Sequence, residues 1–497
     1  MFQRSLVLAS TVLAGCSLIY NPSNLPTPEA DASPDSMQDA EIILDADPTQ
    51  LELERVSPTT IFEGTGTGGS RKALITVHGK QIVPGAKISF SIHGGGPATK
   101  ITVDDAATDV AANGFMVAAP ITIAVDPALT NAMKLRLDVT VTQLAGATEV
   151  TRTLSELVVP VADTPVLELQ GLDELNVASI ALASGVHEYS QVTVSGVITA
   201  ADNAAPLIVR ARGSIALTGA DAAGAGRNNG PGGGLGGAAG GALGTGGTGA
   251  GAGGGKANGG GAGFATAGAG GTAAGAPAGD PQLTTLAAPN RGSGGGGGNG
   301  GALNAGGAGG GGGGTIELSA GGTLIAGTVT AHGGNGGPNT GLGASDGGGG
   351  SGGVVLLRSG VSVAATAVDV AGGTGLNAGA VGRIRTDAPN AIPTTTPAAY
   401  RGPSFAETMP LITRNDDLML NVFGQPDKPI KYVIFNEDRS LVKGPFNGSI
   451  SPAGSNMFPV DKPLFRGLNT ICLQVDAGDT ANDTRNCIDI VYLFTPE

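Results

Sequence analysis

LIVRARGSIALTG (207–219), TIELSAGGTLIAG (315–327) and VVLLRSGVSVAAT (354–366) are three similar stretches in the glycine-rich middle of the chain. Each consists of a short run of strand-forming residues, a glycine and a second short run. Segments dominated by Gly, Ala and Asn separate them. The pattern predicts an internal repeat in which every unit supplies two short strands joined at a glycine corner.

The repeat can be aligned on its shared glycine, which is Gly213, Gly321 and Gly360 in the three copies. On this alignment Ile208, Ile316 and Val355 occupy one position, whereas the position two residues after the glycine holds Ile215, Thr323 and Ser362. A unit that cannot bury its own apolar side is stabilised by stacking on its neighbours. Residues 165–385 are therefore predicted to form a parallel β-helix, and the pattern resembles the glycine-rich β-helical regions of large bacterial surface and secreted proteins.

The long insert 224–314 between the first two copies has two interpretations. One interpretation is a loose linker. Ordering each residue costs about 1–2 kcal/mol of conformational entropy, and glycine has no side chain whose burial could offset that cost. The insert is an ordered bundle if its Gly-Gly-x segments pack as polyproline-II strands, backbone against backbone, with Cα–H···O contacts. In composition it resembles the glycine-rich polyproline-II bundles of some antifreeze proteins and phage adhesin tips. Both interpretations stay open at this point.

Composition excludes several functions. The chain has 497 residues, 88 of them Gly, with 14% charged residues, 3% aromatic residues and a net charge of -14. The negative charge repels phosphate backbones, and the aromatic residues that stack on bases are scarce, so nucleic acid is not an expected partner. The scarcity of aromatic rings also argues against a sugar-binding cleft.

The N-terminus has the features of an export signal. Residues 1–15 contain Arg4 and a short apolar run, and they end in small residues, as secretory signal peptides do. The motif Leu13-Ala-Gly-Cys16 resembles the lipobox of bacterial lipoproteins. The resemblance implies cleavage before Cys16, a diacylglycerol on its sulfur and, because Ser17 follows, release to the outer membrane. The alternative is an ordinary signal peptide with an incidental cysteine.

Residues 16–50 follow as a low-hydrophobicity segment rich in Pro, Ser, Asp and Glu. Such a composition cannot bury enough apolar surface to order itself, so we expect a flexible tether. The membrane would then be a partner through the lipid anchor.

Residues 51–162 alternate apolar and polar side chains between frequent turns, which predicts a β-sandwich. The expected strands are 73–79, 86–92, 114–118, 121–125, 135–141 and 150–154. The stretch 55–90 resembles the immunoglobulin-like IPT/TIG domains of extracellular bacterial proteins, although it lacks a disulfide. His78 and His93 lie on or beside strands, and we favour solvent-facing side chains over a metal-binding pair.

Residues 386–404 form a proline-rich linker, and residues 405–497 are predicted to be a second immunoglobulin-like domain. Cys472 and Cys487 would face each other across a hairpin, and an exported chain permits a disulfide there. That bond would contribute roughly 3 kcal/mol in the chain-entropy model; two free thiols are the alternative. The acidic turn with Asp476, Asp479 and Asp483 is interpreted as solvated rather than as a Ca²⁺ site.

No catalytic residue, metal ligand or cofactor site is predicted. The charged residues on the three stretches and their continuations are scattered, with no two carboxylates in register: Arg210, Arg212, Asp221, Glu317, Arg358 and Asp369. Glycosidases need paired carboxylates, and metal or triad chemistry needs His and Cys at spacings that are absent here. His187 and His332 are isolated.

Taken together, the sequence predicts an all-β, non-enzymatic, lipid-anchored surface protein with a structural or adhesive role. It resembles a bacterial outer-membrane lipoprotein that joins an IPT/TIG-like domain to a glycine-rich β-helix. A polysaccharide or a protein surface is the expected ligand. The alternatives are a β-helix polysaccharide lyase or hydrolase and an accessory subunit of an outer-membrane assembly.

Overall fold

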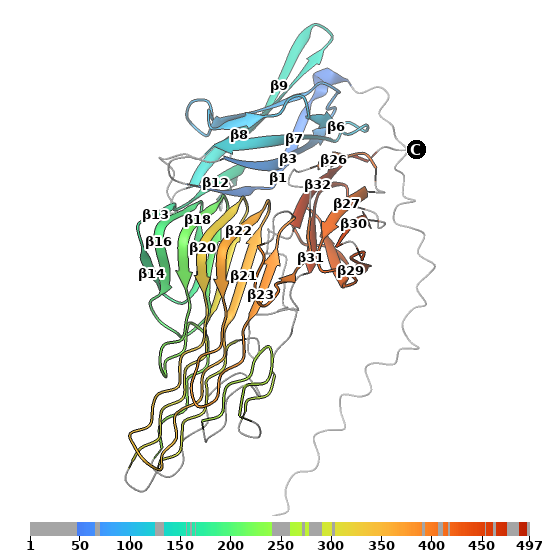
Figure 1. Ribbon diagram of the computed structural model, residues 1–497. Helices are drawn as coiled ribbons and strands as arrows, with labels where there is room; N and C mark the ends of the chain where they lie inside the picture. The colour runs from blue at the N-terminus through green and yellow to red at the C-terminus, as the bar shows by residue number, and fades with distance from the viewer. Residues whose placement is uncertain are drawn as a thin grey trace, which may run out of the picture.

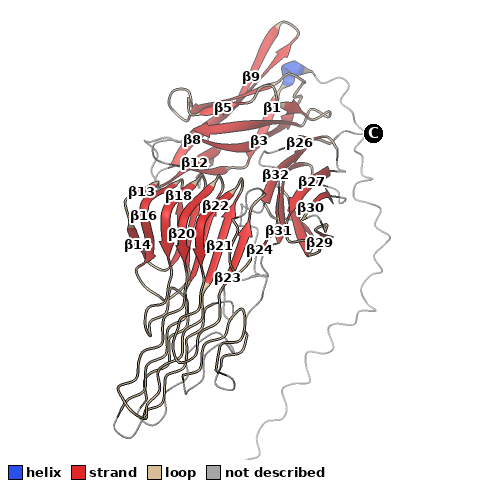
Figure 2. Cartoon of the chain, in the orientation of Figure 1, coloured by secondary structure: helices blue, strands red, loops and turns tan. Residues whose placement is uncertain are grey.

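A computed structural model gives the fold of the protein. It describes residues 47–64, 70–124, 134–155, 157–159, 162–164, 166–240, 259–270, 274–277, 291–300, 304–389, 393–405, 411–415, 418–452, 454–460, 464–474 and 487–494. The regular secondary structure of these ranges consists of β-strands, apart from one 3-10 turn at Pro48–Gln50, and turns and loops connect them (Figure 2), so the predicted all-β class is confirmed. None of the described helices could span a membrane.

The first body is a pair of sheets that enclose one apolar core. One sheet has the order β1 (Glu52–Ser57), β3 (Ser70–Lys80), β7 (Met116–Ala124) and β5 (Ile101–Val103), with β6 (Asp109–Val110) on β7. The other has the order β2 (Thr60–Gly64), β12 (Leu167–Leu172), β8 (Lys134–Ala145) and β4 (Lys87–Ile92), with β9 (Thr148–Leu154) on β8. Inward residues such as Ile75, Val117 and Val139 are fully buried between the sheets. We call this body the first sandwich.

Two expectations for this region were wrong in detail. The expected strands 114–118 and 121–125 are replaced by one continuous strand, β7 (Met116–Ala124), in which Pro120 does not interrupt the pairing with β3. Strand β12 pairs with β8 and β2, so the sandwich ends after Leu172 rather than near residue 162. A short hairpin, β10 (Leu157–Val159) and β11 (Ala162–Thr164), precedes it.

The middle of the chain forms two parallel sheets. One has the order β13 (Leu175–Val177), β16 (Val192–Ala200), β18 (Ile215–Asp221), β20 (Leu324–Thr330) and β22 (Val363–Asp369), with β14 (Ile180–Leu182) on β16. The other has the order β15 (Gly185–Tyr189), β17 (Leu207–Ala211), β19 (Thr315–Ala320), β21 (Val354–Ser359), β23 (Arg383–Asp387) and β24 (Tyr400–Arg401). From β15 to β23 the chain alternates between the two sheets, so each repeated stretch contributes one strand to each.

The register between the first two copies differs from the predicted alignment by one residue. Leu207, not Ile208, lies opposite Ile316, and Ile208 lies opposite Glu317. The turn glycine that matches Gly213 is therefore Gly322, whose N–H donates to the Gly213 carbonyl (2.9 Å). Side chains alternate between the two faces of a strand, so a slip of one residue would turn the apolar set outward. The observed register stacks buried apolar residues in rows, such as Ile215, Leu324 and Val363.

The last body again has two sheets around a core. One has the order β25 (Ser404–Phe405), β27 (Leu418–Phe423) and β30 (Ser455–Val460). The other has the order β26 (Leu411–Thr413), β32 (Cys487–Tyr492), β31 (Gly467–Gln474), β28 (Pro429–Phe435) and β29 (Val442–Ser449). We call this body the C-terminal sandwich. The expected linker, residues 386–404, includes paired strands at its C-terminal end, since β24 pairs with β23 and β25 pairs with β27.

Figure 1 shows how the bodies are arranged. The first sandwich covers one end of the parallel strands, and the glycine-rich segments extend from the opposite end. The C-terminal sandwich lies beside the last parallel strands and also contacts the first sandwich. The chain therefore closes on itself, with its first and last bodies in contact.

Candidate functional site: the glycine-rich bundle and the charge clusters

The glycine-rich segments fold into hairpins that continue from the parallel strands. Between β20 and β21, three backbone bonds pair the descending and ascending arms. The N–H groups of Gly353, Gly350 and Gly347 donate to the carbonyls of Ala331 (2.6 Å), Gly334 (3.0 Å) and Gly337 (2.9 Å). The pairing converges on Leu342, which is the apex of this hairpin.

The segment between β22 and β23 repeats the arrangement on a smaller scale. The Gly382 N–H donates to the Val370 carbonyl (2.7 Å), and the Gly379 N–H donates to the Gly373 carbonyl (2.9 Å). The apex of this shorter hairpin is Leu376. Both apices thus carry a leucine among small and polar residues.

The described part of the 224–314 insert is packed into the same bundle. The Gly310 N–H donates to the Gly348 carbonyl (2.8 Å), and the Gly313 N–H donates to the Ser351 carbonyl (2.8 Å). Across the other side, the Gly334 N–H donates to the Gly311 carbonyl (2.7 Å). For these residues the ordered interpretation holds and the loose one does not. Residues 241–258, 271–273, 278–290 and 301–303 lie outside the described part of the chain.

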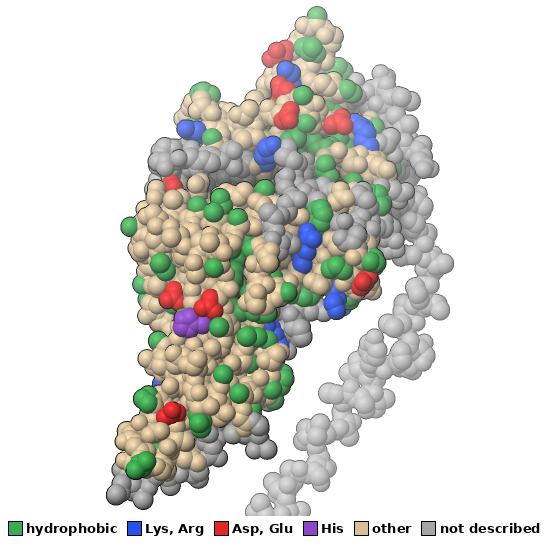
Figure 3. Space-filling model, in the orientation of Figure 1, with side chains coloured by type: hydrophobic (Ala, Val, Ile, Leu, Met, Phe, Trp, Pro, Cys, Tyr) green, Lys and Arg blue, Asp and Glu red, His purple; other side chains and the backbone are tan. Residues whose placement is uncertain are grey.

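Glycine is required here because the backbones touch. A Cβ added at Gly310 would come within 3.0 Å of the Gly334 carbonyl group and the Gly350 nitrogen, and one added at Gly353 would collide with Gly314. Real Cβ atoms do not approach backbone atoms so closely, and only glycine allows this spacing. The bundle is therefore a scaffold of hydrogen-bonded backbone, and Figure 3 shows that its visible surface carries few charged side chains.

The apex loop of the longer hairpin is fixed by hydrogen bonds. The Asn339 N–H donates to the Asp346 carboxylate (2.8 Å), the Ala305 N–H to the Thr340 hydroxyl (2.8 Å), and the Asn304 amide to the Leu342 carbonyl (2.8 Å). The Leu342 side chain is 94% exposed. The loop therefore presents one apolar side chain on a fixed backbone.

A second feature is a buried charge cluster, formed by Arg210, Glu317, Arg358, Arg385 and Asp387. These residues lie on one face of β17, β19, β21 and β23. Arg358 Nε lies 3.0 Å from Asp387 Oδ2, and its Nη1 lies 3.8 Å from Glu317 Oε1. Arg210 Nε lies 3.6 Å from Glu317 Oε1, and Arg385 Nε lies 2.8 Å from Asp387 Oδ1. The cluster links four adjacent strands across the sheet.

The surroundings of the cluster close most of it to solvent, and only Arg210 at its edge is partly exposed, at 30%. The side chain of Arg358 is 2% exposed. The Arg385 guanidinium lies over the Tyr400 ring (5.7 Å), and the Arg383 guanidinium lies over the ring of Phe264 from the insert (4.6 Å). An arginine bridges the two carboxylates of Glu317 and Asp387. The geometry suits a structural tie between strands rather than acid–base chemistry on a substrate, since the carboxylates are buried and ion-paired.

The sequence interpretation of these charges as scattered was wrong. It rested on the misaligned first copy and it stopped before Arg385 and Asp387, which lie on the next strand. In the true register Arg210, Ser319, Arg358 and Asp387 form one row across the sheet. The available signal was a charged residue at the same position of the first and third copies, Arg210 and Arg358, with Ser319 between them in the second.

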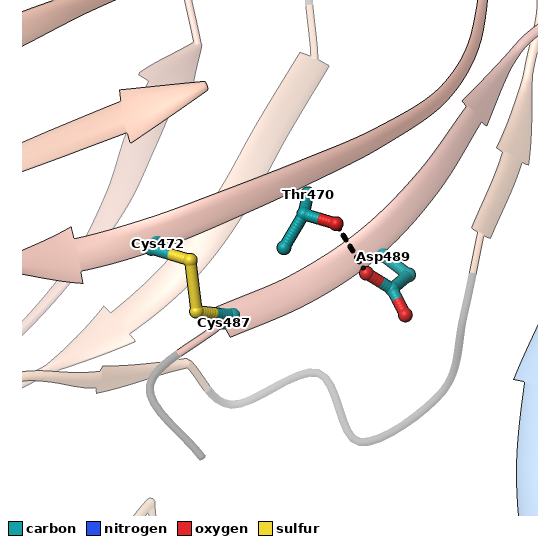
Figure 4. Close-up of a disulfide and its surroundings, with 4 residues drawn as sticks. All are labelled: Thr470, Cys472, Cys487 and Asp489. Atoms are coloured by element: carbon teal, nitrogen blue, oxygen red, sulfur yellow. Dashed lines mark hydrogen bonds between the residues drawn. A yellow bond between two sulfur atoms is a disulfide. The ribbon is translucent and has the colours of Figure 1, made fainter. Parts of the chain in front are cut away.

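The two C-terminal cysteines form a disulfide, as expected from the hairpin. Cys472 on β31 and Cys487 on β32 are direct register partners and are joined by a disulfide (Figure 4). Beside them the Thr470 hydroxyl donates to the Asp489 carboxylate (2.8 Å). The bond closes the hairpin whose turn contains Asp476, Asp479 and Asp483; that turn lies outside the described residues, as do Cys16 and the signal segment.

The four histidines do not form a metal site. His78 Nε2 lies 2.9 Å from the Glu437 carboxylate, and His93 Nδ1 lies 2.8 Å from the Asp138 carboxylate. His187 and His332 contact backbone carbonyls, those of Ala183 (2.7 Å) and Gly333 (3.1 Å). In the described part of the chain no cluster of His, Cys, Asp or Glu could hold a metal ion. His78 is not solvent-facing as expected, because it lies between the two sandwiches.

Comparison with known protein families, with curated proteins and with solved structures found no significant match for this chain.

Proposed function

We propose that the protein is a non-enzymatic, lipid-anchored surface protein whose glycine-rich bundle is an adhesive arm. The observation that supports this proposal is the apex of the longer hairpin, where a hydrogen-bonded loop presents Leu342 with 94% of its side chain exposed. Exposed apolar side chains on a preordered backbone lose little conformational freedom when a partner binds. Such a residue is a candidate anchor for an apolar contact.

The geometry of the bundle suits an extended arm. Each side of the longer hairpin contains about eleven residues between its base at Ala331 and its apex at Leu342. At about 3.1 Å per residue for a polyproline-II-like backbone, the arm would reach roughly 35 Å beyond the parallel strands. Because many of its backbone groups are bonded to neighbouring arms, the bundle keeps the apex at a fixed distance from the body.

The finer architecture belongs to the same proposal. The alternation of the chain between two parallel sheets supports a β-helix, and the pairs of sheets at the two ends support immunoglobulin-like domains. A lipid on Cys16 would hold the protein at the outer membrane and expose it at the cell surface. Pro48–Gln50 and β1 lead into the first sandwich, which lies at the end of the parallel strands opposite to the bundle (Figure 1), so the anchor would be attached at that end.

The buried charge cluster supports a non-enzymatic role. Its carboxylates, Glu317 and Asp387, are ion-paired with arginines and are only 2% and 1% exposed, so they are poorly placed to transfer protons to a sugar. The arrangement is better suited to holding β17, β19, β21 and β23 in register.

The adhesive role can be tested with cells that display the full chain. We expect cells displaying Leu342→Ser to attach less than wild-type cells to methyl-terminated glass, with no change on hydroxyl-terminated glass. Leu235→Ser is the matched control, since Leu235 is also an exposed leucine of the bundle but does not occupy this apex. Equal attachment of wild type and Leu342→Ser at equal surface display would refute the adhesive apex.

A further inference from the structure

The contact between the two sandwiches joins residues that are more than 300 positions apart. Strands β3 and β7 bury both of their faces: Leu74 and Ala118 point away from the core of the first sandwich. They pack against Leu468, Val491 and Leu493 of the C-terminal sandwich. All five side chains are buried. Because this apolar contact covers the outer face of β3 and β7, its loss would expose a new apolar surface.

One carboxylate of the C-terminal sandwich crosses this interface. Glu437 lies in the turn between β28 and β29, and it forms ion pairs with Arg55 on β1 and with His78 Nε2 on β3, the latter at 2.9 Å. The side chains of Glu437 and His78 are 15% and 16% exposed. Arg55 Nη2 also lies 3.4 Å from His78 Nδ1. Two basic groups of one sandwich therefore converge on one acid of the other.

A second ion pair at the interface is more exposed. Arg414, which follows β26, donates through Nε and Nη2 to the two carboxylate oxygens of Asp109 (3.1 and 2.7 Å) and to the Val110 carbonyl (2.7 Å). Both charged side chains are more than a third exposed, so solvent and salt weaken this pair. Arg55 is likewise 51% exposed, so the Glu437–His78 contact, in which both side chains are largely buried, should dominate the response of the interface to pH.

We propose that Arg55, His78 and Glu437 form an acid-operated latch, which closes the C-terminal sandwich onto the first sandwich at neutral pH and opens when Glu437 is protonated. The inference is independent of the adhesive role. Protonation of Glu437 removes the negative charge that attracts both bases, and Arg55 and His78 are then left facing each other without an ionised acid between them.

The pH at which the latch opens follows from the environment of Glu437. Burial alone would raise the pKa of Glu437, but the hydrogen bond and charge of His78, together with Arg55, outweigh burial and lower the pKa. Because the pKa is lowered, ionised Glu437 stabilises the closed form fully at pH values above the ordinary pKa of glutamate, about 4.3. This stabilisation is lost as pH falls through the lowered pKa. The latch therefore opens as pH falls through the lowered pKa of Glu437.

Opening would expose Leu74 and Leu468 without unfolding either sandwich, since each has its own core. The readout is hydrogen exchange of β3 and β31, measured on the full-length chain in detergent by labelling at pH values from 7 to 3.5, with each rate divided by the intrinsic exchange rate at that pH. In the wild type we expect about tenfold faster exchange in the acidic samples, which corresponds to about 1.4 kcal/mol. The inner strands β8 and β28 should stay protected.

Three variants make the test decisive. Glu437→Gln removes the charge, so its exchange at pH 7 should already be faster than that of the wild type, and it should change little on acidification. Glu54→Gln is the control. Glu54 is an exposed acid on β1, the strand of Arg55, and it pairs with Lys80 rather than with Arg55 or His78, so this variant should behave as the wild type. Val491→Asp should open the interface at every pH. If Glu437→Gln follows the wild-type profile while Val491→Asp does not, the latch is excluded.

Discussion

Replacing Gly310 by alanine tests whether the bundle is held together by backbone contact. The N–H of Gly310 donates to Gly348 (2.8 Å), and an added Cβ would lie within 3.0 Å of Gly334 and Gly350 on the neighbouring hairpin. Those atoms belong to backbone that is itself hydrogen-bonded, since the Gly350 N–H donates to the Gly334 carbonyl (3.0 Å). The clash cannot be relieved by turning a side chain, so the arms must separate.

The magnitude follows from two opposing effects. Overpacking of a tightly packed site costs about 1–3 kcal/mol. The loss of backbone freedom in the unfolded chain returns about 0.4–1 kcal/mol on a glycine-to-alanine change. The net destabilisation of the bundle should be about 1–2 kcal/mol, which corresponds to a roughly 5- to 30-fold larger population of the opened form.

Proteolysis under native conditions measures that population. Elastase cleaves beside small residues, and its cleavage rate follows the open fraction when opening is fast relative to cleavage. Gly310→Ala should be cut about tenfold faster in the bundle than the wild type. Gly337→Ala is the matched control, because its added Cβ would meet Ala308 only at 3.3 Å, and its rate should stay close to that of the wild type. Equal rates for Gly310→Ala and the wild type would refute backbone packing at this position.

Three further predictions concern other parts of the molecule. Arg358→Leu removes the central base of the buried charge cluster and should cost about 3–5 kcal/mol, measured by urea unfolding, because Glu317 and Asp387 lose a buried partner; a loss below 1 kcal/mol would argue against the tie. Replacing Cys472 and Cys487 together by serine should cost roughly 3 kcal/mol, with earlier thermal unfolding of the C-terminal sandwich; an unchanged transition would contradict the calculation. Cys16→Ala should release the chain from membranes, and continued membrane binding without lipid labelling would disprove the anchor.

Local pattern was enough to predict most strands. Alternating apolar residues predicted β4, β8 and β9, and the repeated stretches predicted the parallel pairs. The register could not be fixed by glycine alone, because the second copy has two adjacent glycines, Gly321 and Gly322, and both satisfy a turn. Inward packing decides between them, since only one choice stacks Leu207 on Ile316. The register is therefore determined by the apolar residues that stack on one another in adjacent strands, and not by the position of the turn glycine.

Contacts between segments that are far apart in the chain could not be predicted from the sequence. Nothing near Glu437 indicates that it would meet Arg55 and His78, and the pairing exists only because the chain closes on itself. One signal was available: Leu74 lies between the buried Ala73 and Ile75, and a strand with consecutive buried apolar residues is covered on both faces. That run implied a partner for the outer face of β3 without identifying it.

Amide hydrogen exchange of the wild-type protein across residues 304–314 and 331–353 measures most directly whether these glycine-rich segments form an ordered bundle held by backbone hydrogen bonds. Their N–H groups donate to backbone carbonyls of adjacent arms, Gly310 to Gly348 and Gly313 to Ser351 among them. We expect exchange that is slower than in an unstructured peptide by a factor of at least about 100. Exchange at the rate of a free glycine-rich peptide would contradict the account.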